Sequence, residues 1–92
     1  MNEHELPFSV IIAKTAQKQL QSIPRSDAIK VLLKIDELRG DPLPRGCRKL
    51  SVPMSSFRVR TGKYRIIYKV DFKDQVVRIQ DVGHRKNVYE RL

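Results

Sequence analysis

The sequence has no tryptophan and only one cysteine, Cys47, among its 92 residues. A single thiol forms no internal disulfide, which fits a reducing cytoplasm. One cysteine and two distant histidines, His4 and His84, also cannot build a metal site. We therefore predict a cytoplasmic protein that uses no metal and no other cofactor.

Long apolar runs are also absent, since no stretch approaches the roughly 18 residues of a membrane-spanning helix. The first residues, "MNEHELPFSVII", are acidic before a short apolar run, whereas a signal peptide begins with basic residues. We expect no membrane partner. With 40% hydrophobic residues, the chain has enough apolar side chains to fold, and its length predicts one domain over residues 1–92.

Acidic residues are scarce, with 10 Asp and Glu against 19 Lys and Arg, which gives a net charge of +9. No acid occurs between Asp41 and Asp71. The same stretch contains eight basic residues: Arg45, Arg48, Lys49, Arg58, Arg60, Lys63, Arg65 and Lys69. This balance points to a nucleic acid, an acidic membrane surface or an acidic protein as partner, without choosing among them.

The N-terminal half predicts a strand and two helices. "FSVII", residues 8–12, is short and β-branched like a strand, and "AKTAQKQLQSI" has helical spacing up to Pro24. Ser26 or Asp27 is expected to cap a second helix, which Gly40 and Pro42 stop. Its predicted apolar stripe consists of Ile29, Leu32, Leu33, Ile35 and Leu38.

The C-terminal half predicts strands. After a loop over residues 40–56, with a short strand at "RKLSV", come "SFRVRT", "YRIIYKVD" and "VVRIQDVG". The tail "HRKNVYERL" suggests one or two turns of helix. The expected class is α+β in the order β-α-α-β-β-β-β, with an antiparallel sheet and a helical hairpin over one of its faces.

Alternation along the strands gathers cations on the other face of this sheet. Arg58 and Arg60 share a face on one strand, as do Arg65 and Lys69 on the next. We expect this face to be open to solvent. Most charge runs are only solvated surfaces, but here no acids are interleaved, and arginines on neighbouring strands can converge on one phosphate. RNA is the partner that this pattern favours.

Two segments, "FRVRTGKYRIIYKVD" and "VGHRKNVYERL", carry a family resemblance. They contain an aromatic-basic-x-basic strand, a Gly-x-Tyr-Arg turn, a Val-Gly-x-Arg element and a late tyrosine. The chain resembles the RelE branch of the RelE/ParE superfamily of bacterial and archaeal toxins. The resemblance implies a RelE-like fold and a ribosome-dependent endoribonuclease that cuts mRNA in the A site of the 30S subunit. It also implies a cognate acidic antitoxin as partner.

The resemblance further implies site residues. The family's catalytic positions fall on Arg58, Arg60, Arg65, Arg85 and Tyr89. We expect further RNA contacts from Arg48, Lys49, Lys63, Lys69, His84 and Lys86. The implied reaction is attack of the RNA 2′-OH on its own 3′-phosphate, for which no metal is needed. Tyr89 and His84 are the candidates for proton removal from that hydroxyl; alternatively, the ribosome imposes an in-line geometry that needs little help from a base.

Two departures from the family pattern bear on this assignment. Some members have lysines where this chain has Arg58 and Arg60, and an arginine does not act as a general base. Some relatives also place an arginine and a glycine where this chain reads "SV" after "KL". Two alternatives therefore stay open: a ParE-like inhibitor of DNA gyrase without nuclease activity, and a non-catalytic nucleic-acid-binding module.

Overall fold

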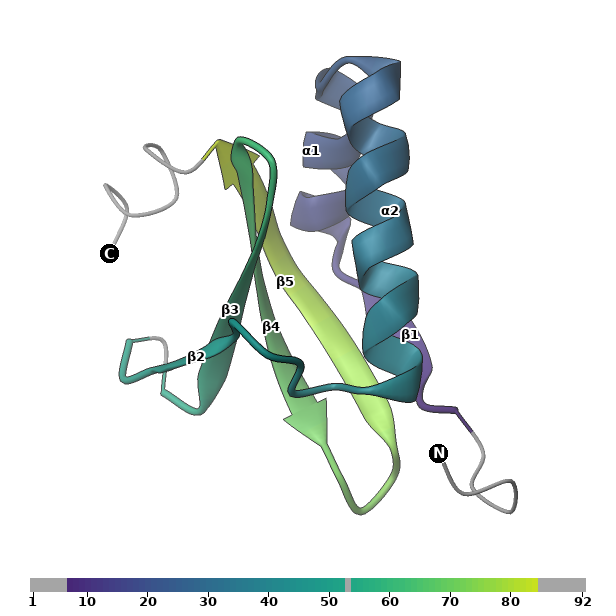
Figure 1. Ribbon diagram of the computed structural model, residues 1–92. Coiled ribbons are helices and arrows are strands. Elements are labelled where there is room, and N and C mark those ends of the chain that lie inside the picture. The colour runs from purple at the N-terminus through teal and green to yellow at the C-terminus, as the bar shows by residue number, and fades with distance from the viewer. Residues whose placement is uncertain (1–6, 53, 85–92) are drawn as a thin grey trace.

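The structure, a computed structural model, describes residues 7–52 and 54–84. Its elements follow the predicted order, as Figure 1 shows. They are β1 (Ser9–Ile12), α1 (Lys14–Ser22), α2 (Arg25–Gly40), β2 (Arg48–Leu50), β3 (Ser56–Thr61), β4 (Tyr64–Asp71) and β5 (Val76–His84). The α+β class is confirmed. The predicted C-terminal helix or tail falls on residues that lie, from 85 onward, outside the described part.

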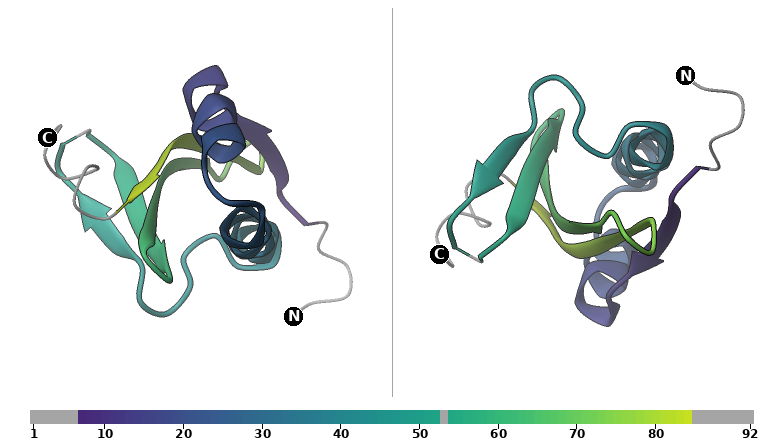
Figure 2. Two further views of the ribbon diagram at one scale, coloured as in Figure 1. Left: turned by 90° about the horizontal axis from the view of Figure 1, so that it is seen from above. Right: turned by 90° about the horizontal axis from the view of Figure 1, so that it is seen from below.

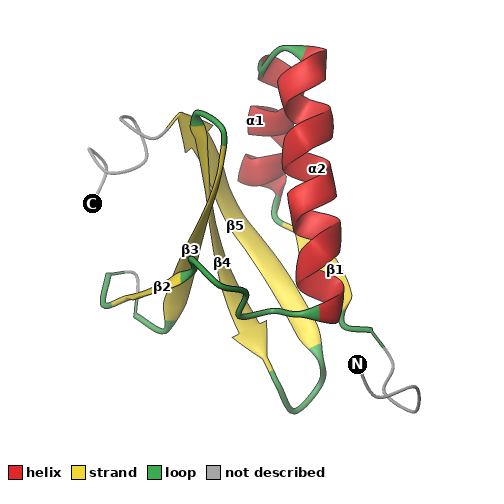
Figure 3. Ribbon diagram, viewed as in Figure 1, coloured by secondary structure: helices red, strands yellow, loops and turns green. Residues whose placement is uncertain are grey.

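The five strands form one sheet in the order β1-β5-β4-β3-β2. Four strands, β2 to β5, pair antiparallel as predicted, but β1 lies parallel to β5, with Ser9 opposite Val76. The first strand therefore completes the sheet beside the last one. Figure 2 shows that the sheet is strongly curved, and Figure 3 separates the strands from the two helices.

Proline sets the boundary between the helices. α1 ends before Pro24, as predicted, and α2 begins directly after it, at Arg25. The predicted side-chain cap is wrong, because Pro24 occupies the N-cap position and no side chain caps the helix there. Proline lacks an N–H group and has a fixed φ, so it suits a helix start. Asp27 lies in the first turn, and its carboxylate instead accepts a hydrogen bond from Tyr64.

The core lies between the two helices and one face of the sheet, and α1 contributes the buried Ala16 to it. α2 buries Val31, Ile35 and Leu38. They belong to one cluster with strand residues that include Ile66, Tyr68, Val77, Ile79 and Val82. The predicted apolar stripe of α2 is therefore wrong in part, since it omitted Val31.

Three members of that predicted stripe lie at the surface instead. The exposed fractions of Ile29, Leu32 and Leu33 are 49%, 45% and 62%. Both sets of residues have helical spacing, and the rotation of α2 on the sheet decides which set is buried.

One glutamine of α1 forms hydrogen bonds with β5, beyond the point where β1 ends. The Gln19 side-chain amide donates to the Asp81 carboxylate, and its oxygen accepts the Val82 N–H at 2.7 Å. Gln19 thus gives this part of the β5 edge the hydrogen bond that a strand would provide. Within residues 7–52 and 54–84, neither helix is long and apolar enough to cross a membrane.

Candidate functional site

The cations of the sheet are brought together by strand register. Arg60 on β3 lies directly opposite Arg65 on β4, and Arg48 on β2 lies opposite Arg58. Arg65 also faces Gly83 on β5, which carries no side chain. Directly opposed residues project to the same face with Cβ atoms about 5 Å apart. The face that holds Arg48, Arg58, Arg60 and Arg65 is called the cation face below.

The cation face is less open than the alternation predicted. The exposed fractions of Arg58 and Arg65 are 3% and 9%, while Arg48 and Arg60 are exposed. Ile67, beside them on the same face, is also buried. The expectation that all these arginines face solvent is therefore wrong for Arg58 and Arg65. Alternation reports which face a side chain takes, and it carries no information on what covers that face.

The Arg60–Arg65 pair has an energetic consequence. Like charges directly opposite on neighbouring strands destabilise a sheet, by roughly 0.2–1 kcal/mol for a pair. A bound anion reverses the sign, because two guanidinium forks then share one set of phosphate oxygens. Burial of Arg58 and Arg65 restricts their side chains before a ligand arrives, which reduces the entropy cost of binding. The cation face is therefore a candidate phosphate site, on which Arg48 and Arg60 are the exposed cations.

A hollow of about 400 Å³ opens beside this face. Its lining includes Arg48, Arg58 and Arg60, and also Arg45 and Lys34. Neither Arg45 nor Lys34 is among the site residues expected from the sequence. The sequence does point to Arg45, since this residue lies in the stretch without acids. Lys34 comes from α2 and reaches the hollow only through the packing of that helix on the sheet.

The loop that carries Arg45 is held in place by a buried tyrosine. The Tyr68 hydroxyl donates to the Pro42 carbonyl at 2.7 Å, and burial together with the nearby Cys47 thiol raises the pKa of Tyr68. The hydroxyl therefore stays protonated and keeps donating. Gly46 then turns the chain with φ at 92°, a conformation that favours glycine.

A second tyrosine lies at the end of the sheet where the predicted catalytic tail begins. Tyr64 is opposite His84, and their rings meet edge to face with centroids 6.1 Å apart. The Tyr64 hydroxyl donates to the Asp27 carboxylate at 3.0 Å. Burial and Asp27 both raise the pKa of Tyr64, so this hydroxyl is a poor general base.

The other predicted RNA contacts fall in different places. Lys49 pairs with Phe57, on the face opposite to Arg48 and Arg58. Lys63 is in the β3–β4 turn, and Lys69 lies opposite Arg78, on the same side of β4 as Arg65. Arg85, Lys86 and Tyr89 lie outside the described residues. Among residues 7–52 and 54–84, no group of three His, Cys, Asp or Glu side chains is arranged to hold a metal ion.

Comparison with known proteins identifies the class and then the family. A sequence model of the family described as "ParE toxin of type II toxin-antitoxin system, parDE" matches residues 10–89. This match covers most of the chain and defines the class as toxins of type II toxin-antitoxin systems. Within that class the chain belongs to the RelE/ParE family.

Relatives from the RelE branch are similar in both sequence and structure. Toxin RelG of Mycobacterium tuberculosis is 31% identical over 94% of this chain and 100% of its own length. The RelE–RelB complex of Pyrococcus horikoshii contains a chain with 34% identity and a TM-score of 0.76, covering 87% of this chain and 97% of that one. The RelBE2 toxin-antitoxin complex of M. tuberculosis gives 29% identity and a TM-score of 0.77, covering 87% and 100%. The RelE-like fold is therefore confirmed.

Proposed function

We propose that the protein is a RelE-like endoribonuclease that cuts mRNA in the ribosomal A site and so inhibits translation. The observation that supports this most is the register that sets Arg60 directly opposite Arg65, with Arg58 and Arg48 beside them. Neighbouring strands thus place several permanently charged arginines close together on one face of the sheet. Cleavage of a phosphodiester by its own 2′-OH requires stabilisation of the charge that develops on the phosphorane.

The proposed roles follow from exposure. Arg58 and Arg65 are buried, so their proposed role is to add positive charge behind the exposed Arg60 and so to stabilise the charge that develops on the phosphate. Arg60 is exposed and suits capture of the incoming strand. The nucleophile belongs to the substrate, so the reaction gives a 2′,3′-cyclic phosphate and a free 5′-OH without a metal. Arg85 is proposed as a further charge stabiliser and Tyr89 as the group that stacks on the base.

The described residues also limit the choice of general base. Arg58 and Arg60 stay protonated. Tyr64 is held by Asp27 and has a raised pKa. His84 and Tyr89 are the remaining candidates from the sequence. We propose that the ribosome supplies most of the in-line geometry, so that cleavage needs little help from a base.

The proposed partners are a cognate acidic antitoxin, mRNA and the ribosome. The solved relatives from P. horikoshii and M. tuberculosis are complexes with an antitoxin. A net charge of +9 favours association with an acidic protein as well as with RNA. The proposed location is the cytoplasm, where ribosomes and mRNA meet.

A comparison of two substrates tests this proposal. One mRNA is presented naked and in a stalled ribosomal complex with an empty A site, and its new 5′ ends are mapped. We expect cleavage only in the ribosome, and cleavage by the Arg65→Ala variant should be slower by about 10²-fold or more. A Lys73→Ala variant, altered in the exposed β4–β5 turn, serves as the control. Equal cutting of both substrates would contradict ribosome dependence, and no cutting of either would contradict the nuclease.

The gyrase-inhibitor alternative has one observation in its favour, namely that the matching family description names the ParE toxin. Brief expression in cells separates the two functions. mRNA cut within translated frames supports the RelE-like activity, whereas intact mRNA with an induced DNA-damage response supports the ParE-like activity. Growth that continues normally would favour a non-catalytic nucleic-acid-binding module.

A further inference from the structure

The last strand, β5, contains a β-bulge near its C-terminal end. Tyr68 of β4 lies opposite Ile79, but its neighbour Ile67 lies opposite Asp81. Gln80 is therefore one extra residue on β5 without a counterpart on β4. Bulges of this kind bend a strand, change the direction of the side chains that follow, and are frequent beside active sites.

The bulge determines which residue lies opposite Arg65. Val82 lies opposite Ile66 and belongs to the core. Gly83 lies opposite Arg65 on the cation face. Without the extra residue the pairing would slip by one, so that Val82 would lie opposite Arg65 and Asp81 opposite Ile66. That register would expose a valine and bury a carboxylate, and both changes are unfavourable. The bulge thus keeps the position opposite Arg65 free of a side chain.

The bulge lies where β1 stops supporting β5. The β1–β5 pairing ends with Ile12 opposite Ile79, and the Ala13 N–H still donates to the Ile79 carbonyl at 2.9 Å. Within the part of the chain that the structure describes, residues 80–84 have a strand partner only on their β4 side. A strand end that is paired on one side opens more readily than the middle of a sheet. Contacts from other elements therefore matter for its register.

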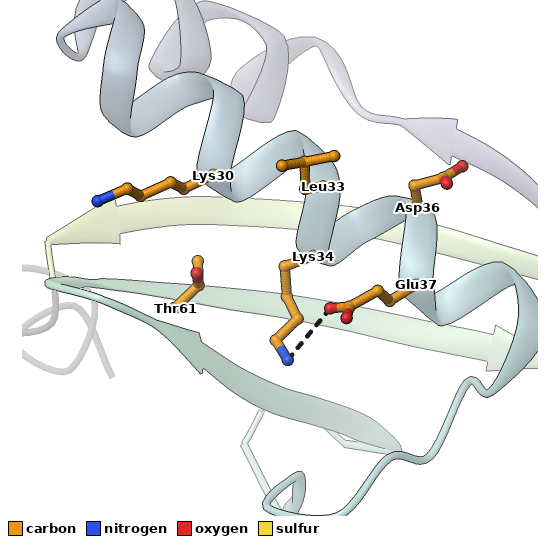
Figure 4. A pocket seen from close by; sticks show the side chains of 6 residues that line it. All are labelled: Lys30, Leu33, Lys34, Asp36, Glu37 and Thr61. Atoms are coloured by element: carbon orange, nitrogen blue, oxygen red, sulfur yellow. Dashed lines mark ion pairs between the residues drawn. The ribbon is translucent and has the colours of Figure 1, made fainter.

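Of the two helices, α1 supplies side-chain hydrogen bonds to this end of β5. α2 faces β3 instead, across a hollow of about 430 Å³ whose lining includes Lys30 and Thr61, as Figure 4 shows. On α1, the Gln19 side-chain nitrogen donates to the Asp81 carboxylate, and its oxygen accepts the Val82 N–H at 2.7 Å. Both bonds are partly buried, which strengthens them relative to bonds in water.

A buried serine contacts the bulge residue itself. Ser56 of β3 is fully buried, and its hydroxyl donates to the side-chain oxygen of Gln80 at 3.3 Å. Three consecutive residues of β5, namely Gln80, Asp81 and Val82, are thus hydrogen-bonded to side chains of other elements. The two bonds from Gln19 are the shorter ones, and one of them reaches the main chain.

We propose that Gln19 is a positioning residue of the cation face. By holding Asp81 and Val82, it maintains the bulge and so the register that sets Gly83 opposite Arg65. It acts through β5 and not through contact with the substrate. The inference rests on the proposed function in taking an RNA phosphate as the ligand of this face. A misplacement of about 1 Å in a reacting site lowers a rate by as much as about 10²-fold, so the precise register matters for cleavage.

Four variants separate this role from a general loss of stability. Gln19→Ala removes both hydrogen bonds to β5. Gln17→Ala is the matched control, because Gln17 lies on the same helix and donates to the Ile12 carbonyl at 2.8 Å, at the end of β1. Gln19→Glu keeps an acceptor for the Val82 N–H but sets a carboxylate against Asp81. Gln19→Glu/Asp81→Asn exchanges donor and acceptor, so the side-chain hydrogen bond forms again at unchanged net charge.

NMR of the full chain measures the register without RNA. Amide hydrogen exchange of Val82 should be about tenfold or more faster in Gln19→Ala, and within about twofold of wild type in Gln17→Ala. Inorganic phosphate is the probe of the cation face. It should shift the Gly83 amide signal of the wild type and of Gln17→Ala, and its Kd should be about threefold or more higher in Gln19→Ala.

Single-turnover cleavage of mRNA in the stalled ribosomal complex measures the consequence for chemistry. At saturating toxin, Gln19→Ala and Gln19→Glu should cut about tenfold or more slowly, whereas the half-saturating concentration should stay within about twofold, because Arg60 still captures the strand. Gln17→Ala should keep both values within about twofold of wild type, and Gln19→Glu/Asp81→Asn should restore the rate to within about threefold. All variants are compared at a temperature at which urea unfolding shows them to be folded.

The inference is overturned if Gln19→Ala cuts mRNA and binds phosphate like the wild type, or if Gln17→Ala loses as much. It is also overturned if Gln19→Glu/Asp81→Asn cuts no faster than Gln19→Glu, a comparison that decides the case should Gln19→Ala not fold. Failure of the proposed function gives a different result: the wild type then cuts no mRNA, and the phosphate titration decides alone. A wild type whose Gly83 signal does not respond to phosphate overturns the inference whatever the cleavage result.

Discussion

Replacing Arg60 with glutamine should make the protein more stable and less active. Arg60 is exposed and lies directly opposite Arg65 on the neighbouring strand. Like charges directly opposite on neighbouring strands repel, and salt screens this repulsion. Arg60→Gln removes the repulsion, keeps a polar side chain of similar reach, and should raise the free energy of unfolding by about 0.2–1 kcal/mol.

Thermal unfolding at low and high salt measures this effect. A gain of about 0.5 kcal/mol corresponds to a rise in Tm of roughly 2–4 °C for a domain of this size, and high salt should abolish it. Lys73→Gln, in the exposed β4–β5 turn, removes one charge from the same highly basic chain without a directly opposed cation. It should change Tm much less. Inorganic phosphate should stabilise the wild type more than Arg60→Gln, because ligand binding to the folded state adds to its stability.

The same variant should lose function. Loss of the proposed contact between Arg60 and the incoming strand should lower the cleavage rate at limiting toxin concentration about tenfold or more. Single-turnover cleavage of mRNA in the stalled ribosomal complex measures this loss. A variant that is less stable than wild type at low salt would refute the charge-repulsion argument. A variant that cuts at the wild-type rate would refute the role of Arg60 in the site.

Four further outcomes are expected. Tyr68→Phe should lower the free energy of unfolding in urea by about 1 kcal/mol, because it removes the hydrogen bond to Pro42; no change would mean that the loop is held otherwise. Arg85→Ala and Tyr89→Ala should fold normally but fail to arrest growth when expressed at the wild-type level; full arrest by both would favour a target other than mRNA. Affinity for isolated RNA should fall with salt at a log–log slope of roughly −3 to −4, and a slope near zero would remove the phosphate contacts. Above pH of about 10 the free energy of unfolding should fall, because the raised pKa values of Tyr64 and Tyr68 let the unfolded state release protons first; an unchanged profile in chemical denaturation would contradict those shifts.

The order of elements was predictable because each boundary has a local cause. Pro24 separates the helices, the two-residue turn at Gly62 joins β3 to β4, and alternation marks the strands. The parallel pairing of β1 with β5 was not predictable in the same way. It depends on where a short apolar strand finds an edge, which no residue of β1 specifies.

The site shows the same division between local and tertiary information. Alternation correctly placed Arg58, Arg60 and Arg65 on one face, because side-chain direction is a local property of a strand. It failed on exposure, since Arg58 and Arg65 are buried. Lys34 was missed for a related reason: the rotation of α2 that brings it to the hollow beside the cation face is set by packing of the whole core.

The pairing of β1 with β5 also sets an order of events during synthesis. Ser9 leaves the ribosome early, but its partner Val76 and the Gly83 that faces Arg65 are made near the end. At about 5–20 residues per second, the nascent chain spends seconds with a sheet that lacks one of its middle strands. Contacts between residues so distant in sequence also form slowly. The strand that carries Gly83, opposite Arg65 of the cation face, therefore joins the sheet only after nearly the whole chain has emerged.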